Sequence, residues 1–296
     1  MIGRVTLKRI AKAAAGRTAA VLAPLDSARQ HPNACILVYH RVAPLGIVDR
    51  SRDDWNVPPA TFERQIAALA ASCELVPLTT LARRLAESPS APKPLVALTF
   101  DDGFANVVTR ALPVLREYAA PATLFSVTSF VGALQPMPFD RWAVANAATV
   151  DRDAWRATTW EELEAWVAAG MDVGSHSHRH LNGRDCEPSQ LTDEAHRSRE
   201  LLTARLGSEA GRSFAYPYGS TRLGHVSPAY RDVVRAAGFS HALTTDLGLV
   251  TQASDPYGLP RLEAHPLDSP GVLRAKARGS LRPYAVLDRL RRADRR

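Results

Sequence analysis

The 296-residue chain has few cysteines and no long hydrophobic run, and both shortages limit what the protein can be. Its three cysteines, Cys35, Cys73 and Cys186, are an odd number without a C-x-x-C pair, which argues against a disulfide framework or a zinc knuckle. No stretch approaches the roughly 18 apolar residues that a membrane span requires. The N-terminal segment also lacks the strong apolar region and the cleavage site of a secretory signal. We therefore predict a cytoplasmic protein.

Net positive charge is missing from the middle of the chain. Residues 1–32 carry +5 and residues 271–296 carry +7, so the total of +7 leaves −5 for residues 33–270. A folded domain that binds nucleic acid would need a basic face of its own, so no nucleic-acid partner is expected. We predict a basic, helical N-terminal extension (1–33), one folded domain (34–270) and a basic tail (271–296). The basic ends either stay solvated or touch an anionic membrane, and the oligomeric state is left open.

The predicted domain alternates between short apolar runs and amphipathic segments. Strand composition marks 34–40, 95–100, 122–127 and 241–245, and helical spacing marks 57–72, 160–170, 188–207 and 229–238. Apolar strands separated by helices form parallel sheets covered by those helices. About seven such units favour a closed (β/α) barrel, in which functional residues follow the C-terminal ends of the strands. Residues 128–159 are less regular and indicate an insertion.

Two adjacent carboxylates, Asp101 and Asp102, follow the apolar run LVALTF (95–100). Alone, an Asp-Asp pair is usually a turn or a helix cap, and Asp-Gly is a common turn dipeptide. At the end of a barrel strand, however, both carboxylates would lie at the mouth of the barrel. One could then bind a metal ion while the other takes a proton from metal-bound water.

The segment GSHSHRHL (174–181) supplies three histidines after another predicted strand. If a helical turn begins there, His176 and His180 form an i, i+4 pair on one face, which lets two imidazoles bind one metal. A carboxylate from another strand would complete a two-histidine, one-carboxylate facial triad with open positions for water and substrate. His178 would point elsewhere. Taken alone, the motif could equally be a solvated histidine cluster.

Three motifs together resemble a known family. TFDDG (99–103), HSHRH (176–180) and FAYPYG (214–219) are similar, in order and spacing, to the first three motifs of the NodB-homology polysaccharide deacetylases, carbohydrate esterase family 4. The resemblance covers roughly residues 34–265. It implies an α/β fold of the distorted (β/α)7 barrel type, a divalent metal and a glycan substrate. Zinc suits two imidazoles and a carboxylate, although cobalt, nickel, manganese or iron could occupy the same ligands.

The resemblance also implies a role for each motif residue. The metal ligands would be Asp102, His176 and His180. Asp101 would be the general base, and the backbone N–H of Tyr218 would stabilise the oxyanion. Ser177 would brace the histidine loop.

The sequence departs from the family pattern at the third motif, where Ala215 replaces a frequent arginine. We expect Arg261, in YGLPRLEAH (257–265), to tune the base instead. The segment LEAH (262–265) matches the family's Leu-x-x-His, which makes His265 a candidate for the acid that protonates the leaving amine. Because a four-letter match is weak, His40, at the end of the first predicted strand, is the competing candidate.

From these motifs we expect a metal-dependent hydrolase that removes N-linked acetyl groups from N-acetylhexosamine units of a polysaccharide or oligosaccharide. Two alternatives stay open. One is an O-acetyl esterase acting on a glycan with the same fold. The other is a catalytically silent glycan-binding protein, which only the missing motif-three arginine supports.

Overall fold

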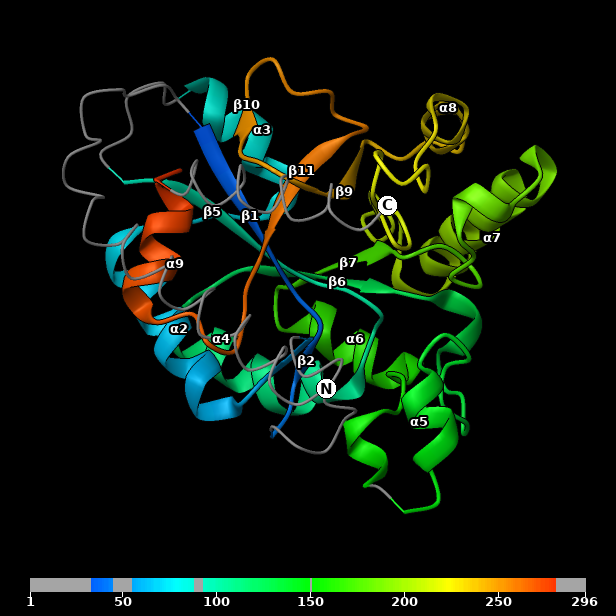
Figure 1. Ribbon diagram of the computed structural model, residues 1–296, viewed down its shortest axis with the longest axis horizontal. Helices are drawn as coiled ribbons and strands as arrows, with labels where there is room; N and C mark the ends of the chain where they lie inside the picture. Colours follow the sequence, from blue (N-terminus) through cyan, green and yellow to red (C-terminus); the bar gives the residue numbers. More distant parts are fainter. Residues whose placement is uncertain (1–32, 45–54, 88–92, 150, 281–296) are drawn as a thin grey trace, which may run out of the picture.

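The computed structural model describes residues 33–44, 55–87, 93–149 and 151–280 (Figure 1). The predicted N-terminal helix and residues 281–296 of the basic tail lie outside these ranges, as does most of the surface predicted to contact a membrane. Within the described ranges, no helix has the length and hydrophobicity that a membrane crossing requires.

Seven parallel strands form a closed barrel, which confirms the predicted fold. In order around the barrel they are β1 (Asn33–Tyr39), β5 (Leu95–Phe100), β6 (Ala122–Ser126), β7 (Asp172–Ser175), β8 (Ser213–Ala215), β9 (His241–Leu247) and β11 (Leu259–Glu263). β1 closes the ring, because it pairs in parallel with β5 on one side and with β11 on the other. The C-terminal ends of all seven strands therefore open on the same side.

Helices cover the outside of this barrel (Figure 1). The described helices are α2 (Pro59–Ser72), α3 (Leu78–Glu87), α4 (Leu112–Glu117), α5 (Arg141–Asn146), α6 (Trp160–Ala168), α7 (Pro188–Leu206), α8 (Pro228–Ala236) and α9 (Pro270–Ala277). A π-helical turn (Val107–Ala111) precedes α4, and 3₁₀ turns occupy Thr128–Phe130, Arg152–Ala154 and Gly183–Asp185. The short strands are β2 (Arg41–Val42), β3 (Asn56–Val57), β4 (Glu74–Leu75) and β10 (Val250–Thr251).

Local sequence signals explain where several helices begin and end. α2 starts with Pro59, whose fixed φ suits the first helical turn, and it buries Phe62, Ile66 and Leu69. α6 starts with a capping box between Thr159 and Glu162, in which each side chain accepts the other residue's backbone N–H. α7 ends at Leu206, directly before Gly207, whose φ is 91°. These signals set the helix bounds before any tertiary contact is considered.

The strand β7 requires a glycine where it faces its neighbours. A Cβ at Gly174 would lie 2.4 Å from the ring of Phe125 on β6 and 2.7 Å from Oγ of Ser213 on β8. Such distances are shorter than any side chain tolerates, so only glycine lets the three strands pack this closely. The histidine motif begins two residues after this glycine.

The insertion at 128–159 folds onto the segment that follows β5. Phe104 and Ala157 form an isolated antiparallel bridge, and the backbone N–H of Thr158 donates to the Gly103 carbonyl at 2.9 Å. On its other side, the insertion is tied to β2 by a buried ion pair between Asp140 and Arg41. The insertion is thus part of the barrel mouth.

The folded domain continues past residue 270, where the sequence analysis begins the basic tail. α9 packs beside α2 (Figure 1) and buries Leu273 and Ala277 in the main hydrophobic core. Lys276 contributes no charge to a solvated tail, because its ammonium group donates to the Glu263 carbonyl and pairs with the Asp268 carboxylate. The predicted boundary is therefore too early: apolar residues spaced along 272–277 cover the barrel although the segment is basic overall.

We expect the substitution Leu273→Ala to lower the free energy of unfolding by about 2–5 kcal/mol, because it removes a fully buried side chain from the core. Urea denaturation measures this change. Leu201→Ala on α7 is the matched control, since Leu201 is 36% exposed and should have a much smaller effect. Equal effects of the two substitutions would contradict the placement of α9 in the folded domain.

Candidate active site and metal centre

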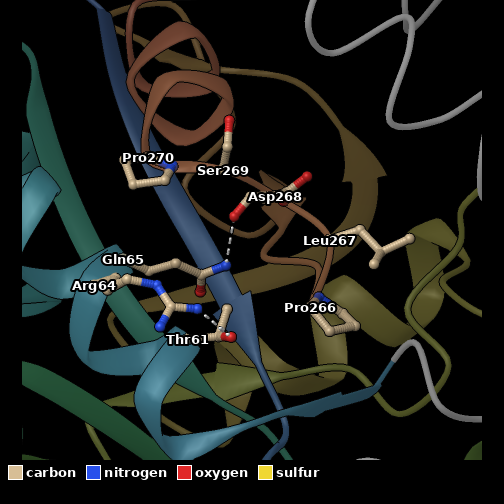
Figure 2. A pocket seen from close by; sticks show the side chains of 8 residues that line it. All are labelled: Thr61, Arg64, Gln65, Pro266, Leu267, Asp268, Ser269 and Pro270. Carbon is tan, nitrogen blue, oxygen red and sulfur yellow. Dashed lines mark hydrogen bonds between the residues drawn. The ribbon is translucent and has the colours of Figure 1, made fainter.

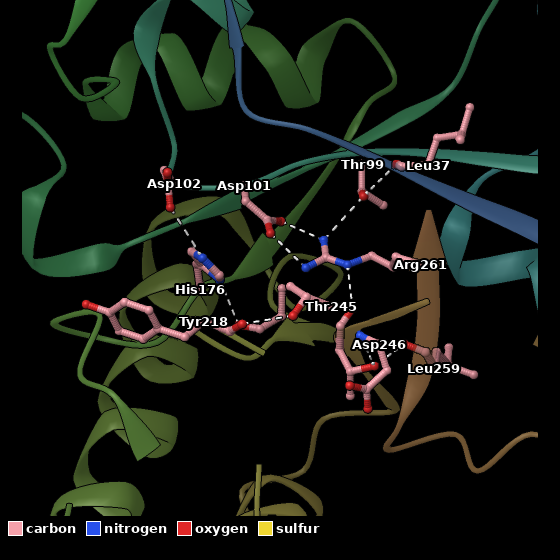
Figure 3. Close-up of polar contacts among 12 residues, drawn as sticks. Leu37, Thr99, Asp101, Asp102, His176, Tyr218, Thr245, Asp246, Leu259 and Arg261 are labelled. Atoms are coloured by element: carbon pink, nitrogen blue, oxygen red, sulfur yellow. Dashed lines mark hydrogen bonds and ion pairs between the residues drawn. The ribbon is translucent and has the colours of Figure 1, made fainter. Parts of the chain in front are cut away.

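The predicted site residues meet at the mouth of the barrel. Asp101 directly follows β5, His176 follows β7 and His40 follows β1, while Arg261 lies on β11. Figure 3 shows Asp101, Asp102, His176 and Arg261 gathered with Tyr218 at this end of the strands. Asp101, His176 and His40 thus follow the C-terminal ends of their strands, as the sequence analysis expects, whereas Arg261 lies within β11.

Asp102, His176 and His180 form a compact set of candidate metal ligands. One ligand atom from each lies within 4.8 Å of the others, and all three residues are buried. Oδ1 of Asp102 is 3.4 Å from Nε2 of His176 and 3.5 Å from Nε2 of His180. Within the described residues, this is the only such cluster of three or more histidine, cysteine or acidic side chains.

The donor chemistry of this cluster fits a divalent metal ion. Nδ1 of His176 lies 2.8 Å from the backbone carbonyl of Ala215. Because a carbonyl only accepts, Nδ1 carries the proton and Nε2 presents its lone pair toward Asp102. Ala215, the residue that replaces the motif-three arginine, thus orients a ligand through its backbone.

The histidine motif is a loop and not the helical turn that the sequence analysis assumes. Residues 176–180 have no helical assignment, and Ser177 and His180 adopt left-handed φ values of 66° and 61°. The two imidazoles converge nonetheless, because the chain reverses between them. The i, i+4 explanation is therefore wrong, although the residues it selected are brought together.

Serine hydroxyl groups hold the backbone of this loop in place. The backbone N–H of His180 donates to Oγ of Ser177 at 3.0 Å, as predicted for the bracing serine, and the N–H of Ser177 donates to Oγ of Ser175 at 3.1 Å. Ser175 in turn donates to Ser198 on α7 at 2.7 Å. The loop is therefore linked to the barrel and to α7 by a continuous chain of hydrogen bonds.

Glu194 on α7 is a supporting residue that sequence reasoning missed. Its carboxylate is almost completely buried, and it accepts from the backbone N–H of Arg179 at 2.6 Å and from Nε of the same residue at 2.7 Å. It thus holds the residue directly before His180. The sequence around Glu194 does not distinguish it from the other polar residues of α7. Only the packing of α7 against the histidine loop brings it to Arg179.

Unusual backbone conformations concentrate at the site. Asp102, Ser177, His180 and Tyr218 are four of the five described non-glycine residues with positive φ, at 72°, 66°, 61° and 59°. This conformation is unfavourable for residues with a Cβ and persists only where surrounding contacts enforce it. The surrounding structure therefore maintains the site geometry against local backbone preference.

Arg261 binds Asp101 as the sequence analysis expects. Its two Nη atoms donate to the two carboxylate oxygens at 2.7 Å each (Figure 3). Its Nε atom donates to the Thr244 carbonyl at 2.9 Å. Both side chains are almost fully buried. Such a two-point ion pair fixes the position of the carboxylate as well as its charge.

The site favours ionised carboxylates. Burial raises the pKa of Asp101, but the Arg261 guanidinium and His176 outweigh it and hold this pKa below its usual value. Burial also raises the pKa of Asp102. The hydrogen bonds with His176 and His180 outweigh this effect and bring the pKa of Asp102 well below its usual value. Both aspartates are therefore charged at neutral pH.

Tyr218 lies in a tight turn after β8. Its carbonyl accepts from Oγ1 of Thr245 at 2.8 Å, and the N–H of Gly219 donates to the Pro217 carbonyl at 2.7 Å. Gly219 has φ of 62°, and a Cβ there would lie 2.8 Å from the backbone nitrogen of Thr245. Glycine is thus needed for the turn that presents the Tyr218 backbone beside the candidate metal ligands.

His265 lies in a buried loop between β11 and α9. Its Nδ1 accepts the Leu267 N–H at 3.0 Å, its own N–H donates to Asp268 at 2.8 Å, and Nε2 of Gln65 donates to its carbonyl at 3.0 Å. A cavity of about 330 Å³ lies between this loop and α2, lined by Thr61, Arg64, Gln65, Pro266, Leu267, Asp268, Ser269 and Pro270 (Figure 2). The lining contains none of the candidate metal ligands.

His40 directly follows β1, which pairs in parallel with β5, the strand that precedes Asp101. The backbone N–H of Asp101 donates to the carbonyl of Tyr39, the residue before His40, at 3.0 Å. The His40 ring stacks on Trp55, with centroids 5.0 Å apart and planes 7° from parallel. His40 also lowers the pKa of Asp101, less than Arg261 and His176 do, and the pKa of Asp102, less than the hydrogen bonds with His176 and His180 do.

Comparison with known proteins agrees with this geometry. The family model described as polysaccharide deacetylase matches residues 88–242, just over half of the chain. The chain is 22% identical over 232 residues to YxkH, a candidate polysaccharide deacetylase of Bacillus subtilis (strain 168), which covers 78% of this chain and 71% of that protein. It is also 23% identical over 177 residues to a poly-β-1,6-N-acetyl-D-glucosamine N-deacetylase of Staphylococcus aureus (strain MRSA252), covering 58% of this chain. In this second case the chain spans only 54% of the relative's length.

Two solved structures share the fold. The Streptococcus pyogenes deacetylase PplD in complex with acetate superposes with a TM-score of 0.65 at 21% identity, covering 81% of this chain and 96% of that one. IcaB from Ammonifex degensii gives a TM-score of 0.64 at 25% identity, covering 83% and 97%. The chain belongs to the polysaccharide deacetylase family, the NodB-homology group of carbohydrate esterase family 4, which confirms the resemblance of its motifs.

We expect zinc binding to depend on the triad and not on the histidine motif as a whole. Isothermal titration of the metal-free protein should show that Asp102→Asn, His176→Ala and His180→Ala each weaken binding by more than the 10–100-fold that outer-shell changes typically cause. His178→Ala is the matched control, because His178 lies in the same motif but bonds Thr128. A similar loss in His178→Ala would contradict the assignment.

We expect Arg261→Met to destabilise the metal-free protein by about 3–5 kcal/mol, because it leaves the buried Asp101 carboxylate without its partner. Adding Asp101→Asn should recover part of this loss, since it removes the unpaired charge. Urea denaturation of both single variants and the double variant measures the coupling. Strictly additive effects would show that the two side chains do not depend on each other.

Proposed function

We propose that this protein is a metal-dependent hydrolase that removes N-linked acetyl groups from N-acetylhexosamine units of a polysaccharide or oligosaccharide. One observation carries the proposal: a buried carboxylate held by Arg261 lies directly beside the carboxylate of the metal-ligand triad. This places a candidate base next to a candidate metal site. The name of the S. aureus relative, an N-acetylglucosamine N-deacetylase, supports the amide substrate.

In this proposal each residue has one task. A divalent cation held by Asp102, His176 and His180 would polarise the acetyl carbonyl and acidify the attacking water, and zinc is our choice because two imidazoles and a carboxylate suit it. Asp101 accepts the proton of that water. The backbone N–H of Tyr218 donates to the oxyanion that develops on the substrate.

We assign the acid that protonates the leaving amine to His40 in preference to His265. His40 is part-exposed and follows the strand that hydrogen-bonds to Asp101, whereas His265 is 1% exposed and its Nδ1 is already bonded to the backbone. An acid must reach the substrate and exchange protons with solvent, which favours the part-exposed side chain. His265 instead fits a structural role in its loop.

Acetate release from β-1,6-linked N-acetylglucosamine oligomers tests the activity. We expect the wild type to release acetate, EDTA to abolish release and zinc to restore it.

Asp101→Asn should lower the rate by about 10²–10⁴-fold while leaving zinc affinity near that of the wild type. Asp172→Asn, a carboxylate substitution at the opposite end of β7, is the control. Normal turnover by Asp101→Asn would refute the mechanism, and release from O-acetyl substrates alone would identify an esterase.

The two candidate acids can be separated by their leaving groups. An amine must be protonated before it leaves, whereas 4-nitrophenolate leaves without a proton. We therefore expect His40→Ala to lose about 10²–10⁴-fold on the amide substrate and little on 4-nitrophenyl acetate. His265→Ala should show no such selectivity. The reverse pattern would move the role to His265.

A further inference from the structure

The two histidine ligands are oriented in different ways. His176 is fixed by the hydrogen bond between its Nδ1 and the Ala215 carbonyl. His180 has no equivalent, because its Nδ1 is buried and has no hydrogen-bond partner in the structure. A ligating imidazole almost always donates its second nitrogen to an orienting partner, so some other contact must hold the ring of His180.

That contact is the side chain of Phe139. Its ring stacks on the imidazole of His180 with centroids 3.8 Å apart and planes 23° from parallel. Tyr218 approaches the same imidazole only at 5.1 Å and a tilt of 57°. The face-to-face contact therefore comes from the insertion and not from the third motif.

We propose that Phe139 is a positioning residue that holds the imidazole of His180 with Nε2 toward Asp102, by stacking in place of a hydrogen bond. Rotation of the imidazole would move Nε2 away from Asp102 and would meet the Phe139 ring. This inference rests on the proposed metal-binding function, and it gives the 128–159 insertion a direct part in metal affinity.

The structure fixes Phe139 firmly enough for this role. The next residue, Asp140, forms a buried ion pair with Arg41, and its Oδ1 accepts the Ala143 N–H at 3.2 Å at the start of α5. The Arg41 guanidinium lies 3.8 Å from the centroid of the Phe104 ring. Phe139 is therefore tied to the barrel through β2, whose Arg41 directly follows His40.

The same tie joins two parts of the site. Arg41 follows the candidate acid and Asp140 follows the residue that stacks on the second metal ligand. A single buried ion pair thus links β2, which begins directly after His40, to the loop that contains Phe139. Removal of either charge would disturb both groups, so the test below changes only the stacking ring.

Zinc titration of the metal-free, full-length chain tests the proposal. We expect Phe139→Leu to weaken zinc affinity about 10-fold, at the lower end of what outer-shell partners contribute, and Phe139→Tyr to stay near the wild type because it keeps the stacked ring. Phe130→Leu is the matched control, since Phe130 lies in the same insertion and touches Phe139 but not His180 in any ring contact. Phe139→Met serves if the leucine variant does not fold.

Two further readouts separate positioning from general destabilisation. The thermal midpoint of the metal-free variants reports folding alone, and the visible spectrum of the cobalt-loaded protein reports ligand geometry. Weaker zinc binding and an altered cobalt spectrum in Phe139→Leu, without these changes in Phe130→Leu, would support the proposal. Wild-type affinity in Phe139→Leu, or an equal loss in Phe130→Leu, would overturn it. If the wild type binds no zinc, or His180→Ala binds as well as the wild type, the proposed metal site fails as well.

Discussion

The buried ion pair between Asp101 and Arg261 is the interaction on which the rest of the site depends. Two adjacent carboxylates at the end of a buried strand would repel each other and resist ionisation, because burial raises the pKa of both. Arg261 neutralises one of them through two hydrogen bonds. Asp102 is then left to the two histidines, so the neighbouring carboxylates can take different tasks.

The closure of the barrel makes this pair possible. Arg261 and Asp101 are 160 positions apart and lie on strands separated by β1 alone. Because β1 pairs with both neighbours in parallel, the guanidinium can reach past it to the carboxylate. The same closure explains how Ala215 can stand where the family often has an arginine: the charge is supplied by β11, and the Ala215 carbonyl orients His176.

Above the strands, the site depends on support from outside the motifs. The left-handed residues of the histidine loop are held by a chain of serines, by the buried Glu194 and by the ring of Phe139. The serine contacts are local, whereas Glu194 comes from α7 and Phe139 from the insertion. The arrangement resembles a general feature of metal sites, in which outer contacts fix the direction of each ligand.

The sequence by itself determined the barrel class, the alternation of strands and helices and most of the candidate residues that gather at the strand ends. It could do so because apolar runs, helix periodicity and strand-end polar residues are local patterns. It also selected Arg261, but for the histidine loop it offered a helical explanation that the backbone does not follow. The end of the domain was misplaced for a similar reason, since basic residues masked the apolar face of α9.

Only the tertiary structure decided which groups touch. Glu194 and Phe139 have no sequence signal, because a buried acid on a polar helix and an aromatic residue in an irregular segment look ordinary until packing brings them to the loop. The relation of His40 and His265 to the aspartates likewise depends on strand register and burial. Local propensity set the elements, whereas contacts between residues 39 to 160 positions apart in the chain set the direction of side chains in the site.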